Sequence, residues 1–258
     1  MTCQYFTPGR GGSVIQNVTF VRHCQLTNSC LEHHPDVARD LGALSEVLGN
    51  TNRPFEAEVL LGRALAISEH VHGPTHPESI KYINNLAKIL RSTNRLVESQ
   101  AFYWRALMLA LHSFEDGHPR LSVQLTNLAS ILTYRGQLAL AEPLLRHALR
   151  MHERHAQIEH TSIAAVLDNL TGVLRRSGRI SEAELAGRRV VRVFALFRDS
   201  SGFDHPQAQY SLRQYVDVLR ELGHDDEEIR RRVTAAAKQP LEPLSPELDR
   251  SREGQIRE

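Results

Sequence analysis

The chain has 258 residues, of which 24% are charged, and its formal net charge is +1. A balance this close to neutrality gives no general attraction to nucleic acid or to anionic membranes. The cysteines are odd in number and all precede residue 31, so they do not suit a disulfide framework. No secretory leader and no apolar run of about 18 residues is found, so we expect a cytoplasmic protein without nucleic-acid or membrane partners.

Residues 1–33 fit neither a helical nor a strand period, and Pro8 with the neighbouring glycines predicts a loop. The segment could be a degenerate cap, the remnant of an upstream repeat, or disordered. The segment and the residue that follows it hold candidate zinc ligands: His23, Cys24, Cys30, His33 and His34. Because the two nearest cysteines are spaced more widely than in usual zinc sites, we expect no metal here.

From His34 onward the chain repeats itself. Five units open at His34, His76, His118, His160 and His205, with spacings of 42, 42, 42 and 45 residues. Four of these histidines precede proline, and His160 precedes threonine. Proline suits the first position of a helix, so we predict a helix start at each histidine. The predicted repeats are 34–75, 76–117, 118–159, 160–204 and 205–238, since a period of 20 to 50 residues is typical of stacked repeats.

Each unit begins with an amphipathic helix of about four turns. Apolar residues recur seven, ten and fourteen positions after the histidine, as in Leu41, Leu44 and Leu48, and again as Leu212, Tyr215 and Leu219. Eighteen positions after the histidine stand residues that adopt the left-handed conformation at low cost: Asn52, Asn94, Gly136, Gly178 and Gly223. This column predicts the turn that ends the first helix.

A second helix is predicted after each turn, with small residues where the two helices of a unit meet. These positions hold Ala57, Ser99, Ala141 and Ala183, and then Ala64, Ala106, Ala148 and Val190. Three extra residues in the fourth unit are expected in a connecting loop. The apolar run 193–197 in that unit could pack against the fifth unit or contact a partner. Residues 225–238 are predicted to form a terminal capping helix, and 239–258 a disordered tail.

The order His-Pro, Leu-x-Asn-Leu-Ala, Gly/Asn-Arg, Glu-Ala-Glu and Arg-Ala-Leu resembles the 42-residue tetratricopeptide repeats of kinesin light chains and nephrocystin-3-like proteins. The resemblance covers roughly residues 34–224. It implies an all-α fold, a right-handed superhelical solenoid of antiparallel helix pairs with about five repeats. The chain departs from the pattern at Gly42-Ala43 and at Gln214-Tyr215.

One face of the first helices cannot belong to the core. Positions five, nine, twelve and sixteen after each histidine lie opposite the apolar stripe, and such faces line the concave surface of stacked helical hairpins. Position nine holds Ala43, Asn85, Asn127, Asn169 and Gln214. Asparagine is a poor helix former, but its amide can pair with the backbone of an extended peptide. The resemblance implies the same use, although these amides could instead bond to a neighbouring helix or to water.

We therefore predict a peptide-binding groove. Its candidate residues are Asn84, Asn85, Asn127, Asn169, Lys81, Lys88, Arg91, Tyr134, Arg175, Arg176 and Arg213. Acidic residues partly offset the basic ones, among them Asp168, Asp217 and Glu221. The predicted groove is modestly basic, so the expected guest is an extended segment with acidic side chains.

The leading hypothesis is a protein-interaction scaffold without chemistry, cofactor or metal of its own. One alternative is a regulatory or oligomerising module of a larger enzyme or signalling assembly. Another is a metal-dependent protein, but residues 152–155 lack the His-Glu-x-x-His spacing that places two ligands on one helix face. No phosphate-binding loop or nucleophile elbow is present either. The oligomeric state is left open.

Overall fold

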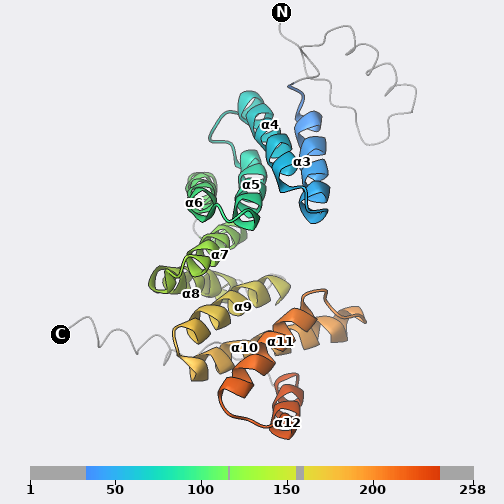
Figure 1. Ribbon diagram of the computed structural model, residues 1–258, viewed down its shortest axis with the longest axis vertical. Helices are drawn as coiled ribbons and strands as arrows, with labels where there is room; N and C mark the ends of the chain where they lie inside the picture. The colour runs from blue at the N-terminus through green and yellow to red at the C-terminus, as the bar shows by residue number, and fades with distance from the viewer. Residues whose placement is uncertain (1–32, 116, 155–159, 239–258) are drawn as a thin grey trace, which may run out of the picture. The chain divides into compact units, whose positions relative to one another are not determined.

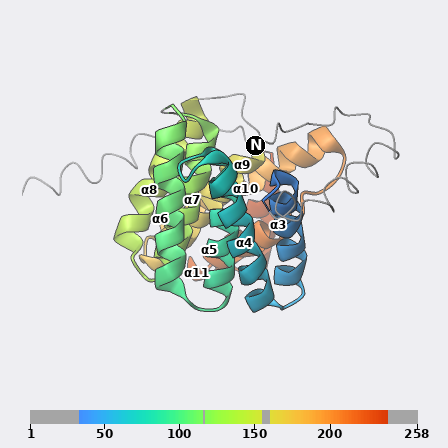
Figure 2. The same ribbon diagram turned by 90° about the horizontal axis from the view of Figure 1, so that it is seen from above.

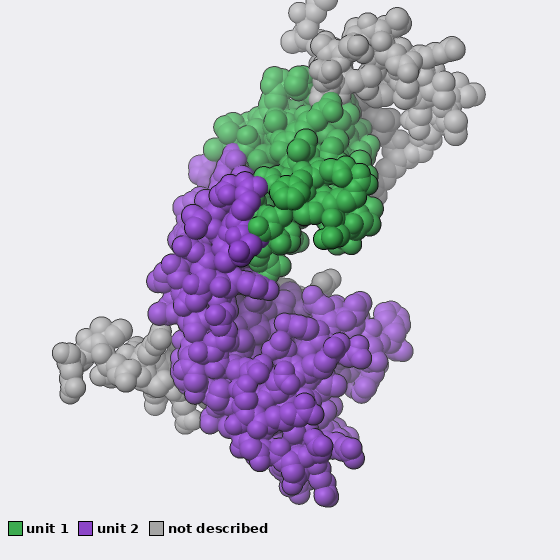
Figure 3. Space-filling model, viewed as in Figure 1, with its two compact units in different colours: residues 1–93 green, residues 94–258 purple. Residues whose placement is uncertain are grey.

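The computed structural model describes residues 33–115, 117–154 and 160–238, and every regular element in these ranges is a helix (Figure 1). The chain divides into two compact units, Met1–Thr93 and Asn94–Glu258 (Figure 3). The boundary lies between the two helices of the second predicted repeat. We describe each unit separately.

The described residues of unit 1 form three helices and a 3-10 turn: α3 (Pro35–Asn50), α4 (Pro54–His72), η1 (Pro77–Ser79) and α5 (Ile80–Ser92). Helix α4 contacts both α3 and α5, and Ala57 and Ala64 are fully buried on it. Gly42 on α3 explains one departure from the repeat pattern. A Cβ atom there would lie 3.0 Å from Cε1 of Tyr82 on α5, so any larger residue would require this ring to shift slightly.

Within its described residues, unit 2 has seven helices: α6 (Leu96–Ser113), α7 (Pro119–Tyr134), α8 (Leu138–Arg154), α9 (His160–Arg176), α10 (Ile180–Ser201), α11 (Ala208–Glu221) and α12 (Asp226–Ala236). Each helix packs against the next one along the chain (Figures 1 and 2). The predicted small residues are buried where helices meet: Ser99, Ala106, Ala141, Ala148, Ala183 and Val190.

The repeat-opening histidines cap the helices that follow them. Nδ1 of His34, His76 and His118 accepts a hydrogen bond from the backbone N–H two residues later, at 3.1–3.2 Å. His205 does the same at 3.2 Å, although the regular part of α11 begins only at Ala208. Each imidazole thus pairs one of the N–H groups that a helix start leaves without an intrahelical acceptor.

The turns between paired helices follow the predicted column. The φ angles of Asn52 and Asn94 are 60° and 62°, and those of Gly136, Gly178 and Gly223 are 76°, 74° and 83°. All five residues are therefore in the left-handed region, which other side chains adopt only with strain.

Two predicted core residues are exposed instead, namely Leu44 on α3 and Leu212 on α11. Tyr215, the equivalent of Leu44 in the fifth repeat, packs against Gly187 of the preceding repeat, whereas no helix that precedes α3 lies in the described residues. Leu212 lies on α11, the first helix of the fifth repeat, and no further helix pair follows among the described residues to cover it. Their exposure follows from their place at the ends of the described repeats.

The extra residues of the fourth repeat do not form the expected loop. Helix α10 continues to Ser201 and is 22 residues long, against 18 for α6, and Gly202 ends it with a φ of 79°. Val193, Phe194 and Ala195 are buried. The Phe194 ring stacks on His205, with 5.1 Å between the ring centroids. The run 193–197 therefore packs against the start of the fifth repeat.

Candidate peptide-binding site

In unit 2 the first helices α7, α9 and α11 lie side by side, because α9 contacts both α7 and α11. Polar bonds join them as well. Arg176 on α9 donates to the Thr133 carbonyl of α7, and Arg175 donates from Nε to Glu221 of α11 at 2.6 Å. The same face of each helix is open to solvent, so the three helices present one polar surface.

The asparagine column lies on these open faces. Asn127 on α7 and Asn169 on α9 are each half-buried, and so is Asn85 on α5 of unit 1. Within the described chain no hydrogen bond meets the amides of Asn85 or Asn127. Asn169 donates from Nδ2 to the Ala165 carbonyl of its own helix at 2.8 Å, which leaves its amide oxygen as an acceptor.

In unit 1 the corresponding surface is a line along α5. Lys81, Asn85 and Lys88 stand four and three residues apart, so they follow one face of the helix. Both lysines are exposed. Lys81 contacts Glu78 and lies over the ring of Tyr82, 4.8 Å from its centroid. Asn84 lies beside this line, but its amide oxygen is buried and accepts no hydrogen bond from the described residues.

The remaining predicted residues differ in what they can offer a guest. Tyr134, Arg176 and Arg213 are exposed, and Arg91 is half-buried. Arg213 donates to the Gln209 carbonyl of its own helix at 3.3 Å. Much of the charge of Arg175 is already met by Glu221 and, at 3.7 Å, by Asp217. The surface of unit 2 is therefore less basic than the sequence indicates. On α5 the charge of Lys81 is already met in part by Glu78, so the exposed Lys88 supplies most of the basic character there.

Asp168 contributes a buried acid beneath this surface. It lies on α9 and accepts a hydrogen bond from the Ser211 hydroxyl of α11. Burial raises the pKa of Asp168 to about 6, and the hydrogen bond from Ser211 opposes the shift. The pair joins α9 to α11, but the charged form of the carboxyl is poorly solvated there.

Asp168→Asn is expected to raise the free energy of unfolding by about 2 kcal/mol at about pH 7.5, allowing for partial exposure. The native state binds this proton more tightly than the unfolded chain. The contribution of Asp168 to the free energy of unfolding of the wild type is therefore greatest below about pH 4 and falls as the pH rises to about 6. Urea unfolding at about pH 7.5 and at about pH 4 should show that the variant gains less free energy of unfolding over the wild type at the lower pH. Asp217→Asn, a change at a more exposed acid on α11, is the control and should bring no such gain.

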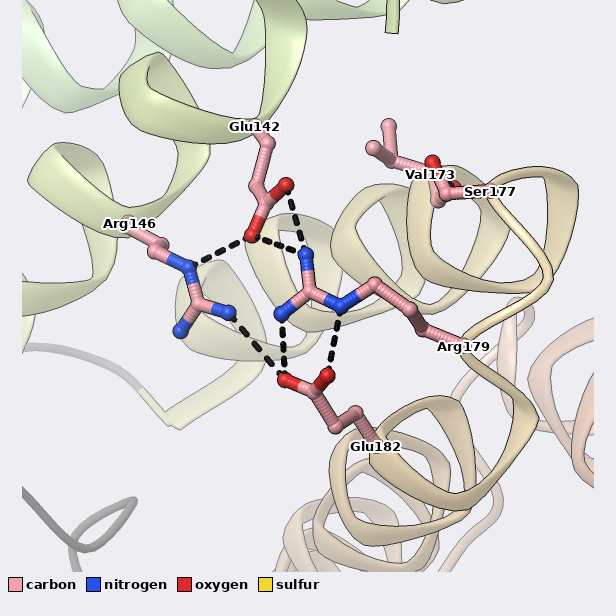
Figure 4. A network of polar contacts seen from close by, with 6 residues as sticks. All are labelled: Glu142, Arg146, Val173, Ser177, Arg179 and Glu182. Atoms are coloured by element: carbon pink, nitrogen blue, oxygen red, sulfur yellow. Dashed lines mark hydrogen bonds and ion pairs between the residues drawn. The ribbon is translucent and has the colours of Figure 1, made fainter. Parts of the chain in front are cut away.

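A second polar cluster was not predicted from the sequence (Figure 4). Glu142 on α8 is only 2% exposed and accepts from Arg146 at 2.9 Å and from Arg179, through both oxygens, at 2.7 and 2.9 Å. Arg179 precedes α10 and also forms a two-point contact with Glu182. Burial favours the neutral acid, but hydrogen bonds from Arg179 and Arg146 outweigh it and hold the pKa of Glu142 below its usual range. Beside the cluster, the Ser177 hydroxyl donates to the Val173 carbonyl at 2.9 Å.

The residues weighed as metal ligands have other contacts. Within the described ranges, no three histidine, cysteine or acidic side chains come together as ligands would. His33 packs on the His70 ring and His34 caps α3, while His23, Cys24 and Cys30 lie outside the described residues. His152 is buried, and its Nε2 lies 2.6 Å from the Ser122 hydroxyl, so this pair joins α8 to α7. No described helix is both long enough and apolar enough to span a bilayer.

Helix pairs repeated in this way, with polar faces on the first helices, define a helical repeat protein. Tetratricopeptide repeat models match residues 120–196 and residues 41–78, so the chain contains tetratricopeptide repeats. No curated protein matches the chain in sequence.

Solved structures share the fold. The TPR-like repeats of a candidate kinesin light chain from Podosopora anserina are 20% identical, with a TM-score of 0.62 over 79% of this chain and 96% of that one. BtubC (BKLC) from P. vanneervenii is 15% identical, with a TM-score of 0.63 over 91% of this chain and 96% of that one. The apo form of RapI is 16% identical, with a TM-score of 0.62 over 88% and 77%. Identities this low establish a common fold only.

Proposed function

We propose that the chain is a protein-interaction module that binds an extended segment of a partner along the open faces of its first helices. Tetratricopeptide repeats generally serve protein–protein interaction. The observation that carries the proposal is the row α7, α9 and α11, whose open faces adjoin and hold Asn127 and Asn169 at equivalent positions. Amides in such a row can pair with successive peptide groups of an extended chain. The role requires no catalytic chemistry, and a cytoplasmic location stays a prediction.

The proposed segment carries acidic side chains. Support comes from α5, where Lys81 and Lys88 flank Asn85 on one helix face. A carboxylate of the guest would meet an ammonium group there while Asn85 pairs with the backbone, and such charge-assisted bonds are stronger than neutral ones. Arg176 and Arg213 would contribute on unit 2, whereas Arg175 would contribute little because Glu221 and Asp217 already neutralise it.

The test is an array of synthetic peptides of about ten residues that differ only in having acidic or basic side chains at alternate positions. Asn85→Ala combined with Asn127→Ala is expected to weaken binding of the acidic set about tenfold or more, since each lost amide contact is worth about 1 kcal/mol. Gln207→Ala, which removes an exposed amide outside the first-helix faces, is the control.

Equal affinity of the folded double variant and the wild type would remove the asparagine assignment. The charge assignment is tested separately by Lys88→Glu, which is expected to abolish the preference for acidic over basic peptides. If that preference is absent from the wild type, the guest is not acidic, even if peptides bind.

A further inference from the structure

Helix α6 carries an apolar stripe that no other described helix covers. The stripe consists of Val97, Ala101, Trp104, Met108 and Leu111, and we call it the α6 stripe. Its four larger side chains are between 43% and 67% exposed, and Trp104 is the only tryptophan of the chain. The opposite face of α6 is buried through Ser99, Tyr103 and Ala106, so the helix is apolar on two sides.

The spacing of the α6 stripe is that of a coiled-coil seam. Successive members stand 4, 3, 4 and 3 residues apart, which places them at alternating d and a positions of two heptads. A seam this narrow fits one facing helix rather than a broad core. Tryptophan and methionine at its centre are residue types enriched where proteins meet.

The repeat fold does not require this stripe. At the equivalent positions of its last three members, α8 has Arg146, Arg150 and Glu153, and α4 has Gly62, Ala66 and Glu69. The second helices of the first and third repeats therefore fold with small or charged residues at these three positions, although α4 has the exposed Phe55 and Val59 where α6 has Val97 and Ala101. The apolar side chains of α6 are exposed without contributing to packing among the described residues, and a contiguous exposed patch of about this length commonly marks an interaction site.

We propose that the α6 stripe is the contact between two copies of this chain, with the two α6 helices antiparallel. In that arrangement Trp104 faces the small Ala101 of the partner, and Met108 faces the partner's Val97. Large side chains thus oppose smaller ones around a two-fold axis, as a self-complementary interface requires. A parallel pair would instead place Trp104 against its own copy.

Charges beside the α6 stripe favour the same arrangement. Glu98 and Arg105 each follow a d position, so both lie at e positions on one flank of the seam. In the antiparallel pair, the Glu98 of each copy, which also contacts Arg95 just before its own helix, faces the Arg105 of the other, and this gives two opposite-charge contacts. The near-neutral net charge of +1 adds no repulsion between copies. A single helix pair is a small interface, so the association is weak and depends on concentration.

The experiment uses the full chain between about 1 µM and 1 mM, with its mass followed by light scattering and sedimentation equilibrium. We expect the mass to rise from one chain toward two, with the emission of Trp104 moving to shorter wavelength as the ring leaves water. Trp104→Arg and Met108→Glu should each raise the dissociation constant at least about tenfold. Phe55→Arg, a change at a 70% exposed aromatic residue on α4, is the control and should leave association unchanged.

Charge reversal then separates a second copy from other partners. Glu98→Arg and Arg105→Glu are each expected to weaken association several-fold, and the double variant should restore it, because the pairs re-form with opposite sign. A wild-type mass of one chain at every concentration would overturn the proposal, as would association that survives Trp104→Arg and Met108→Glu. Failure of the double variant to restore association would overturn the antiparallel arrangement.

Discussion

Glu142→Ala is expected to lower the free energy of unfolding by about 3–5 kcal/mol, because it leaves two arginines without their shared buried carboxylate. Arg179 donates hydrogen bonds to both carboxylate oxygens of Glu142, and Arg146 donates one. Arg179 keeps Glu182 after the change, and Arg146 keeps only the longer 3.4 Å contact to it. The loss falls where α8 meets α10, so urea unfolding and hydrogen exchange of these helices provide the measurement.

A matched control is Glu98→Ala, which also removes a glutamate in two-point contact with arginine, here Arg95 at 2.7 and 2.5 Å. That pair is exposed, and its loss should cost less than about 1 kcal/mol. Because the pKa of Glu142 is lowered in the folded protein, its contribution is present above about pH 4.5 and is lost as the pH falls below that value. Equal destabilisation by the two alanine variants would contradict the importance assigned to burial.

Tyr215→Ala is the second large expected effect, a loss of about 3–5 kcal/mol confined to the last repeat. Tyr215 on α11 is 1% exposed and packs in a core cluster with Leu219, Ile229 and Ala236. Its hydroxyl donates to Oε1 of Glu184 at 3.0 Å, and burial raises the pKa of Tyr215 above its usual value. Truncation would open a cavity at the contact of α10, α11 and α12 and remove a partner of the buried Glu184.

The matched variant Tyr215→Phe keeps the ring and removes only the hydroxyl, so it should cost about 1–2 kcal/mol. Hydrogen exchange should show α11 and α12 opening in Tyr215→Ala while α7 and α8 stay protected, since repeats are stabilised mainly by their neighbours. Loss of protection throughout unit 2 would show that the last repeat is not an independent end but part of one cooperative core.

Periodic features of the fold could be predicted from the sequence because each depends on one residue and its own helix. The left-handed turn residues Asn52 and Gly136, and the buried alanines Ala64 and Ala148, are of this kind. Leu44 was wrongly predicted to be buried, because its burial depends on a neighbouring helix that the repeat pattern assumes. The helix that extends to Ser201 was missed for a different reason, since an insertion in the sequence does not indicate whether it lengthens a helix or a loop.

Part of the polar cluster around Glu142 follows a pattern in the sequence. Arginine follows the turn residue and glutamate stands three residues later, as in Arg53 and Glu56 or Arg179 and Glu182. The spacing predicts the contact within a repeat, but not that Arg179 also reaches Glu142 of the preceding one. The binding role of the asparagine column stays a prediction. The neutralisation of Arg175 by Glu221 could not be predicted from the sequence, because those residues are 46 apart.

The fit between Gly187 and Tyr215 fixes the order of the last two repeats. A Cβ atom at Gly187 would lie 2.9 Å from Cδ2 of Tyr215, so α10 accepts this ring only because it has glycine there. The equivalent residue of the preceding repeat is Leu145. If the fourth repeat were deleted, or exchanged with the third, leucine would occupy the space of the tyrosine ring. The fourth and fifth repeats are therefore best transplanted or duplicated together, because a module inserted between them would separate Gly187 from Tyr215.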